Sequence, residues 1–218
     1  MESTNVLVVG ASGNTGIEIC KVLNQNNVDY TALVRPGSES KLPNETESIL
    51  FGSVMEKEEM KKVLGDVSKN KFSDVVIALG SRDLKGIPIR SEGTQNVIHA
   101  LNHGYSEEEL PTLHVISAHG VGDSWNLLSG MEKLIAKWLI GKTMKDHEIQ
   151  EKAVLAYYGK HHIVRPVGLK DQPATHSIYA AELEKMPSSQ IARADVAEYL
   201  VRSIQQKIFG IHSVSNQS

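Results

Sequence analysis

The sequence predicts an α/β protein of the Rossmann type, a doubly wound parallel sheet with helices on both faces and a small C-terminal substrate lobe. Short β-branched apolar runs alternate with amphipathic helical segments along most of the chain. The first run, Val6–Val9, leads into a loop that carries Gly10, Gly13 and Gly16 and then into a helical segment. The run Val75–Leu79 is apolar throughout, which is typical of a strand buried between two helix layers.

Each expected element has a local signal. Strands are expected where four to eight apolar or β-branched residues end at glycine, proline or a polar turn, at residues 6–9, 30–34, 48–52, 73–80, 112–117, 162–166 and 210–214. Helices are expected where apolar residues recur at helical spacing, at residues 17–23, 55–64, 91–101, 123–141, 145–155 and 192–204. The chain is then one domain over 1–218, whose substrate lobe is built mainly from about 120–145 and 167–192.

The composition limits the possible partners. A net charge of −3 gives no reason to expect nucleic acid or an anionic membrane as a partner. The single cysteine, Cys20, excludes an internal disulfide and cysteine-based metal sites, and the pair His99 and His103 lacks a third ligand, so no metal is expected. No apolar run approaches membrane-spanning length and the N-terminus lacks a secretion signal, so a cytoplasmic protein is expected.

The glycine loop after the first strand is typical of a dinucleotide-binding site. Gly10 permits a tight turn, Gly13 lets the backbone approach a pyrophosphate, and Gly16 lets the helix lie close to the strand. The helix N-terminus offers unpaired N–H groups and a partial positive charge. The residues expected to bind the cofactor here are Gly10, Ser12, Gly13, Asn14, Thr15 and Gly16. The alternative is a strand–turn–helix connection with permissive glycines.

The end of the second strand indicates which dinucleotide binds. An acidic residue at this place takes the 2′-hydroxyl of NAD, whereas an arginine accommodates the 2′-phosphate of NADP. Here Arg35 follows the strand, Ser38 and Lys41 come shortly after it, and no acid stands at the strand tip. NADP(H) is therefore the expected cofactor, the alternative being that Arg35 is a solvent-facing loop cation.

The ends of the other strands carry further candidates, because cofactors lie at the carboxyl edge of such sheets. The additional expected cofactor ligands are Ser53, Val54, Leu79, Gly80, Arg82, Pro166 and Val167. The expected substrate residues are Ser117, Ala118, His119, Trp125 and Val167. Ser117 and His119 are of a type that can bind a substrate carbonyl or carboxylate. The alternatives are that Arg82 is a surface arginine and that Ser117 only satisfies backbone groups.

Several motifs together resemble, in order, those of the atypical short-chain dehydrogenases. They are Gly10-Ala-Ser-Gly-Asn-Thr-Gly16, Leu33-Val-Arg35, Leu79-Gly-Ser-Arg82, Ser91-Glu-Gly93, Ser117-Ala118, Asp146-His147 and Asp171-Gln-Pro173. The sequence is most similar to the NADPH-dependent flavin reductases, also called biliverdin-IXβ reductases, with NmrA-like proteins as relatives. The resemblance implies a monomer that passes hydride from NADPH to a small-molecule electron acceptor, namely a flavin, quinone or linear tetrapyrrole. It also implies that Ser117 and His147 act at the nicotinamide and the substrate.

The residue pair that typical short-chain dehydrogenases use is missing. They carry Tyr-x-x-x-Lys, in which the lysine lowers the pKa of a phenol that protonates an alkoxide. None of the six tyrosines has a lysine four residues later. Alcohol–carbonyl chemistry is therefore disfavoured, whereas a conjugated acceptor delocalises the charge and can take its proton from solvent.

The substrate pocket departs from that of the flavin reductases. They carry a histidine in a Pro-Pro-His context, where this chain has Arg165-Pro-Val-Gly168, and His119 stands where they carry an aromatic residue. These changes favour a flavin or quinone over a tetrapyrrole as acceptor. The missing dyad is equally consistent with a second hypothesis, a non-catalytic NADP(H) sensor of the NmrA-like type.

Overall fold

The computed structural model describes residues 4–80, 87–138 and 141–217, and it confirms the Rossmann-type architecture. Eight strands form one sheet in the order β3-β2-β1-β4-β5-β6-β10-β8, parallel except for β8. The strands of this sheet are β1 (Asn5–Val9), β2 (Asp29–Val34), β3 (Ser48–Phe51), β4 (Asp74–Ile77), β5 (Thr112–Ile116), β6 (His161–Pro166), β8 (Ile178–Ala181) and β10 (Gly210–Asn216). The strand order reverses between β1 and β4, which is the switch point where ligands bind in this class of fold.

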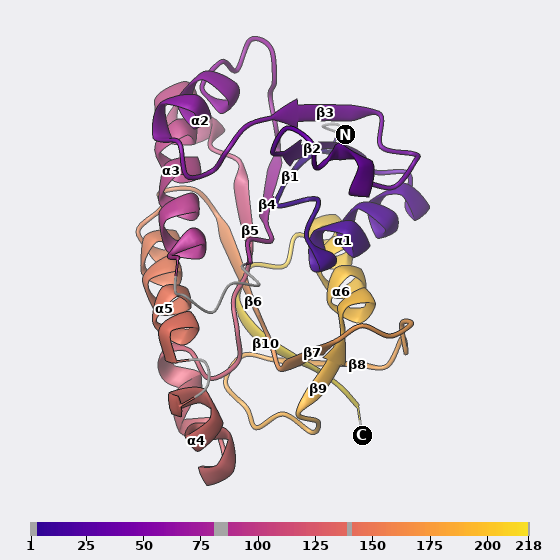
Figure 1. Cartoon of the computed structure of the whole chain (residues 1–218), viewed down its shortest axis with the longest axis vertical. Coiled ribbons are helices and arrows are strands. Elements are labelled where there is room, and N and C mark those ends of the chain that lie inside the picture. Colours follow the sequence, from indigo (N-terminus) through magenta and orange to yellow (C-terminus); the bar gives the residue numbers. More distant parts are fainter. Residues whose placement is uncertain (1–3, 81–86, 139–140, 218) are drawn as a thin grey trace.

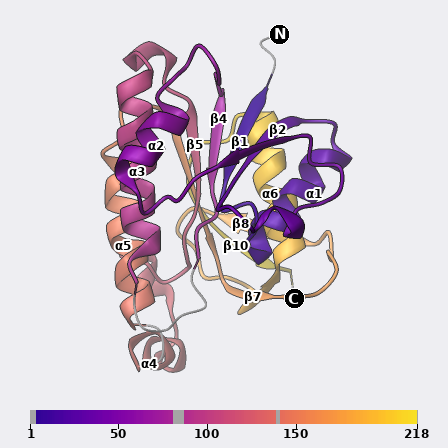
Figure 2. The same ribbon diagram turned by 45° about the horizontal axis from the view of Figure 1, so that its top comes forward.

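Helices cover both faces of the sheet (Figures 1 and 2). On one face lie α2 (Lys57–Leu64), α3 (Ile89–Gly104) and α5 (Gly141–Leu155), and on the other lie α1 (Asn14–Gln25) and α6 (Arg193–Gln206). Short 3₁₀ turns occur at Glu39–Lys41 (η1), Glu107–Glu109 (η2) and Gly122–Leu127 (η3). No helix among the described residues is long and apolar enough to span a bilayer.

Each face of the sheet has its own apolar core, which is why the central strands are apolar on both sides. Val6 and Val8 of β1 pack toward α1 and α6, in a cluster with Ile19 and Leu200. The alternate residues Leu7 and Val9 pack toward the other helix layer. All the apolar β1 side chains are fully buried, so this strand lies at the centre of the molecule and fixes the position of the glycine loop that follows it.

The single helix expected over 123–141 is wrong, because the structure divides that stretch into η3 and α4 (Gly130–Trp138). Gly122, the first residue of η3, has a left-handed φ of 59°. The second piece begins with a capping box, in which Ser129 N–H donates to Glu132 Oε2 (2.7 Å) and Glu132 N–H donates to Ser129 Oγ (3.3 Å). The apolar periodicity continues across the break and hides it from a sequence-based prediction.

The stretch 167–192 contains three strands that the sequence did not indicate. β7 (Gly168–Lys170) pairs with β9 (Gln190–Ala192) in a separate two-stranded sheet, in which Gly168 N–H donates to Ser189 O. β8 pairs antiparallel with β10 and so belongs to the main sheet. These strands are short and flanked by polar turn residues, so their pairing depends on distant parts of the chain and leaves no local pattern.

Candidate functional site

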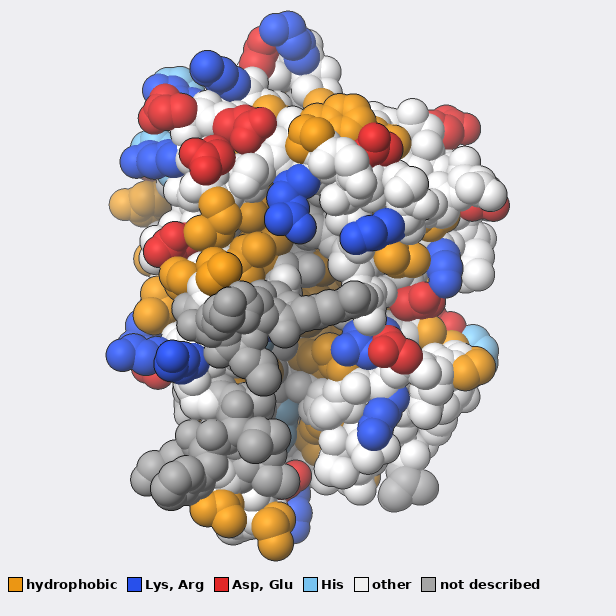
Figure 3. Space-filling view, viewed as in Figure 1, with side chains coloured by type: hydrophobic (Ala, Val, Ile, Leu, Met, Phe, Trp, Pro, Cys, Tyr) orange, Lys and Arg blue, Asp and Glu red, His pale blue; other side chains and the backbone are white. Residues whose placement is uncertain are grey.

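A cleft of about 740 Å³ lies along the carboxyl ends of β1, β2, β4 and β5. Figure 3 shows this face of the molecule with a hollow near its centre and several Lys and Arg side chains around it. The predicted site residues that line the cleft are Gly10, Ser12, Gly13, Asn14, Thr15, Arg35, Lys41, Ser53, Val54, Leu79, Gly80, Ser117 and His147. Residues from seven separate parts of the sequence are thus brought together at one edge of the sheet.

Other predicted site residues are not part of this lining. They are Gly16, Ser38, Ala118, His119, Trp125, Pro166 and Val167. Ser38 lies in the turn after Arg35, and its backbone N–H donates to the Arg35 carbonyl oxygen. His119 Nδ1 lies 2.9 Å from Ser213 Oγ of β10, so its ring is tied to the sheet. Arg82 lies outside the described residues, and the roles expected for all of these residues stay predictions.

The glycine loop has the geometry that its sequence predicts. Gly10 has φ +82°, and a Cβ there would lie 2.7 Å from the Ala78 carbonyl oxygen. Gly16 is buried, and a Cβ on it would lie 2.2 Å from Gly10 O, so it packs α1 against the loop instead of facing the cleft. Gly13 is the extended N-cap of α1 and supplies no capping side chain. The N-terminus of α1 therefore points its first N–H groups at the cleft, as phosphate-binding helices do.

The charged side chains that line the cleft are all basic. Arg35 and Lys41 stand beside the ends of β2 and η1, while Arg90 and Arg193 line it from the first turns of α3 and α6. Among the described lining residues there is no aspartate or glutamate. Such a cleft attracts a polyanion, and the pair at the β2 end lies where the adenosine ribose of a dinucleotide would lie.

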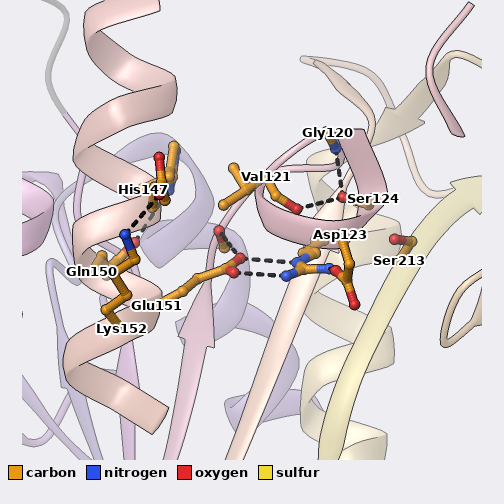
Figure 4. Close-up of polar contacts among 12 residues, drawn as sticks. Gly120, Val121, Asp123, Ser124, His147, Gln150, Glu151, Lys152 and Ser213 are labelled. Atoms are coloured by element: carbon orange, nitrogen blue, oxygen red, sulfur yellow. Dashed lines mark hydrogen bonds and ion pairs between the residues drawn. The ribbon is translucent and has the colours of Figure 1, made fainter. Parts of the chain in front are cut away.

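The inner end of the cleft contains a buried hydrogen-bond network, drawn in Figure 4. Ser117 Oγ donates to Glu151 Oε1 on α5 (2.6 Å). Glu151 also accepts two bonds from Arg165 of β6, from Nε (2.9 Å) and Nη2 (2.7 Å), and Arg165 Nη1 donates to Asp123 (2.5 Å). Ser117, Glu151 and Arg165 are each at least 95% buried. Because the Ser117 proton is held by Glu151, this hydroxyl presents lone pairs to a ligand.

His147 is held in one orientation by a second chain of hydrogen bonds. Its Nδ1 lies 3.1 Å from Gln150 Oε1, and Gln150 Nε2 donates to Thr94 Oγ1 of α3 (3.0 Å). This arrangement assigns the proton to Nδ1 and leaves Nε2 as an acceptor. Burial, together with the nearby positive charge of Arg90, lowers the pKa of His147 to about 4. At neutral pH the ring is uncharged and is a poor proton donor.

Twelve lining residues were not among the predicted site residues. They are Ile17, Leu33, Val34, Gly52, Met55, Ala78, Ile87, Ile89, Arg90, Ile116, Leu169 and Arg193. Arg193 is the first residue of α6 and pairs with Asp171 (2.6 Å). Arg90 precedes the Ser91-Glu-Gly93 motif, but helix α3 begins earlier than expected, at Ile89, which turns this side chain into the cleft. No group of three or more His, Cys, Asp or Glu side chains that could hold a metal ion occurs in the described part of the chain.

Solved structures of similar fold include several redox proteins. The anaerobilin reductase ChuY of Escherichia coli O157:H7 is 18% identical, with a TM-score of 0.77 over 98% of this chain and 97% of that one. A proposed NADH-flavin reductase of Streptococcus pneumoniae is 18% identical, with a TM-score of 0.74 over 98% and 100%. A short-chain dehydrogenase/reductase of Veillonella parvula in complex with NADP is 12% identical, with a TM-score of 0.77 over 98% and 94%.

At these identities the structural likeness shows the fold alone, and the sequence comparison carries the assignment further. The model of the NAD(P)H-binding family matches residues 10–207, which is nearly the whole chain and includes the glycine loop, both buried networks and α6. The match, the cleft and the fold agree on one class of ligand. The chain therefore belongs to the NAD(P)H-binding family, with a Rossmann-type fold.

Proposed function

We propose that this protein is an NADPH-dependent reductase that passes hydride to a flavin, quinone or related conjugated acceptor. The observation that carries the proposal is the distribution of charge and protons along the cleft. Among the residues that the structure describes, the outer end is lined by cations and by no carboxylate, and neither Ser117 nor His147 at the inner end is ready to donate a proton. The first property fits a cofactor with three phosphates, and the second fits an acceptor that needs no protein acid.

The residues present fit NADPH. Arg35 and Lys41 would pair with the 2′-phosphate, for which an arginine at the end of the second strand is suited. The N-terminus of α1 would take the pyrophosphate. Ser117 and His147 would lie beside the nicotinamide, each offering a hydrogen-bond acceptor to a ligand. When bound, NADPH supplies two electrons and a proton as hydride to the acceptor, which takes its second proton from water.

The protein then contributes orientation and exclusion of water more than acid–base chemistry. Alcohol–carbonyl reduction would require a donor for the developing alkoxide, and the hydroxyl best placed for that task, Ser117, already donates to a buried carboxylate. A flavin or quinone ring spreads the added charge over several atoms. We therefore expect a small-molecule acceptor, a protein that acts as a monomer, and no partner among nucleic acids or membranes.

The test is a screen of NADPH oxidation with riboflavin, FMN, menadione and biliverdin, run beside the same screen with NADH. We expect turnover with at least one acceptor. Arg35→Ala should raise the KM for NADPH about tenfold or more and that for NADH much less, because it removes a phosphate partner. Lys62→Ala, which removes an exposed cation of α2 away from the cleft, is the matched control and should change neither KM. Tight NADP(H) binding without turnover of any acceptor would favour a redox sensor instead.

A further inference from the structure

The side chain of Arg90 carries a positive charge that the described residues only partly compensate. It is 14% exposed and lines the cleft beside Gly80, whose Cβ, if present, would lie 3.7 Å from Arg90 Nη2. Its Nε is buried and has no hydrogen-bond partner among the described residues. A buried guanidinium with an orphaned N–H is costly unless something satisfies it.

The carboxylate that the described residues place near Arg90 is already in use. Asp146 of α5 lies 3.6 Å from Arg90 Nη1, which is longer than a hydrogen bond. Its oxygens instead accept from the backbone N–H groups of Arg90 (3.2 Å) and Ser91 (3.0 Å) and from Ser91 Oγ (2.5 Å). Asp146 thus caps the N-terminus of α3 from a neighbouring helix. Its negative charge is shared with that helix terminus and is only partly available to the guanidinium.

The position of Arg90 in its own helix adds to the excess of positive charge. It is the second residue of α3, in the first turn, where the helix dipole is unfavourable for a cation. Arg90 and His147 both line the cleft, and the charge of Arg90 contributes to lowering the pKa of His147. Neither effect stabilises the fold, which favours a role in binding.

The phosphates expected of the cofactor already have their partners. The 2′-phosphate has Arg35 and Lys41, and the pyrophosphate has the N-terminus of α1. Arg90 lines the cleft from α3, which lies with α5 and its residue His147 on the face of the sheet opposite α1. A cation at this place would meet the electron acceptor.

We propose, resting on the reductase function above, that Arg90 binds an acidic group of the electron acceptor, so that the preferred acceptors carry a phosphate or carboxylate. The planar guanidinium suits both groups, because each offers two oxygens to its paired N–H donors. Among the described residues His147 Nε2 and Ser117 Oγ are acceptors, so an anion at this end of the cleft would meet Arg90 as a donor.

Two pairs of acceptors test the proposal, because the members of each pair differ only in the acidic group. FMN and riboflavin differ in a phosphate, and biliverdin and its dimethyl ester differ in two carboxylates. Binding is measured by fluorescence or calorimetry on protein saturated with NADP⁺, where no turnover occurs, and initial rates are measured with NADPH. The variants are Arg90→Met, which keeps the length of the side chain, Arg90→Lys, which keeps the charge, and Lys145→Met as control. Lys145 is exposed on α5 next to Asp146 and does not line the cleft.

We expect the wild-type protein to bind the acid of at least one pair tenfold or more tightly than its neutral partner. Arg90→Met should abolish that preference while changing the affinity for the neutral partner less than twofold. Arg90→Lys should keep part of the preference and Lys145→Met nearly all of it. The pair that shows the preference identifies the acidic group as phosphate or carboxylate.

Equal affinity for acid and neutral partner in the wild-type protein would overturn the proposal, even if both are reduced and the reductase function stands. So would a preference that survives in Arg90→Met, or an Arg90→Met variant whose loss is confined to NADP⁺ affinity. Conversely, an Arg90-dependent preference for acids without any turnover would support this site and contradict the reductase function. Thermal unfolding of each variant serves to verify that the fold is intact.

Discussion

Acidification should destabilise this protein through a cluster of histidines on the neighbouring strands β5, β6 and β10. His162 of β6 is fully buried, with His114 of β5, His212 of β10 and Tyr199 of α6 around its ring. Its Nε2 lies 3.2 Å from His212 Nδ1, and its own Nδ1 has no partner among the described residues. Burial, and then the charges that neighbouring histidines would carry, lower its pKa from 6.5 to about 3.

The sign and the size of the effect follow from linkage. Below pH 6.5 the unfolded chain binds a proton that the folded protein does not, so stability falls as the pH drops from 6.5 toward 3. Between pH 7 and pH 4.5 the contribution of His162 is about 2.5 kcal/mol, at about 1.36 kcal/mol per pKa unit. His147, whose pKa is lowered to about 4, also makes the protein less stable as the pH falls through this window. Its contribution is the same in the wild-type protein and in a variant of His162, so it cancels in the comparison.

The assay is urea unfolding at pH 7 and pH 4.5, followed by tryptophan fluorescence. His162→Phe keeps a ring in the cluster but cannot bind a proton. The loss of unfolding free energy on acidification should therefore be smaller in this variant than in the wild-type protein by about 2.5 kcal/mol. His99→Phe, at an exposed position of α3, is the control and should behave as the wild type does. An equal loss in wild type and His162→Phe would refute the reasoning.

Two further substitutions test the structure of the site. Glu151→Gln should lower the free energy of unfolding by about 3 kcal/mol, because it removes the buried carboxylate that pairs with Arg165 and leaves this guanidinium with the more exposed carboxylate of Asp123. A melting temperature within about 2 °C of wild type would contradict the network. Gly16→Ala should abolish NADP⁺ binding, because the added Cβ would lie 2.2 Å from Gly10 O. Gly130→Ala is the control and should leave binding unchanged, because its Cβ would meet nothing within 4 Å. Calorimetric titration with NADP⁺ measures the affinity of both variants.

The sequence predicts the sheet and the outer end of the cleft well, because both depend on local signals. A buried parallel strand is apolar along its length, and the loop after β1 needs glycine for steric reasons that appear directly in the residue types. Position along the chain also places Arg35 at the end of β2. Pairings such as β7 with β9 depend on contacts between distant residues, which have no local pattern.

The inner end of the cleft shows a different limit of sequence reasoning. Ser117 could be placed at the end of β5 from the sequence, but its chemistry depends on Glu151, which is 34 residues away, and on Arg165, which pairs with Glu151. From residue type alone Ser117 is a hydroxyl that can donate to a substrate carbonyl. In the folded protein its proton already belongs to a buried carboxylate, and the His147 proton belongs to Gln150.

The hydrogen bonds that already hold the protons of Ser117 and His147 determine the chemistry of the site more than the types of these two residues do. With Ser117 and His147 both acting as acceptors, the donor available at the inner end of the described cleft is the guanidinium of Arg90. A guanidinium does not give up its proton at physiological pH, so it can stabilise negative charge but cannot serve as a general acid. Under the proposed reductase function, a site of this kind would favour acceptors that remain anionic or delocalised as they are reduced, and it would disfavour those that must be protonated by the protein.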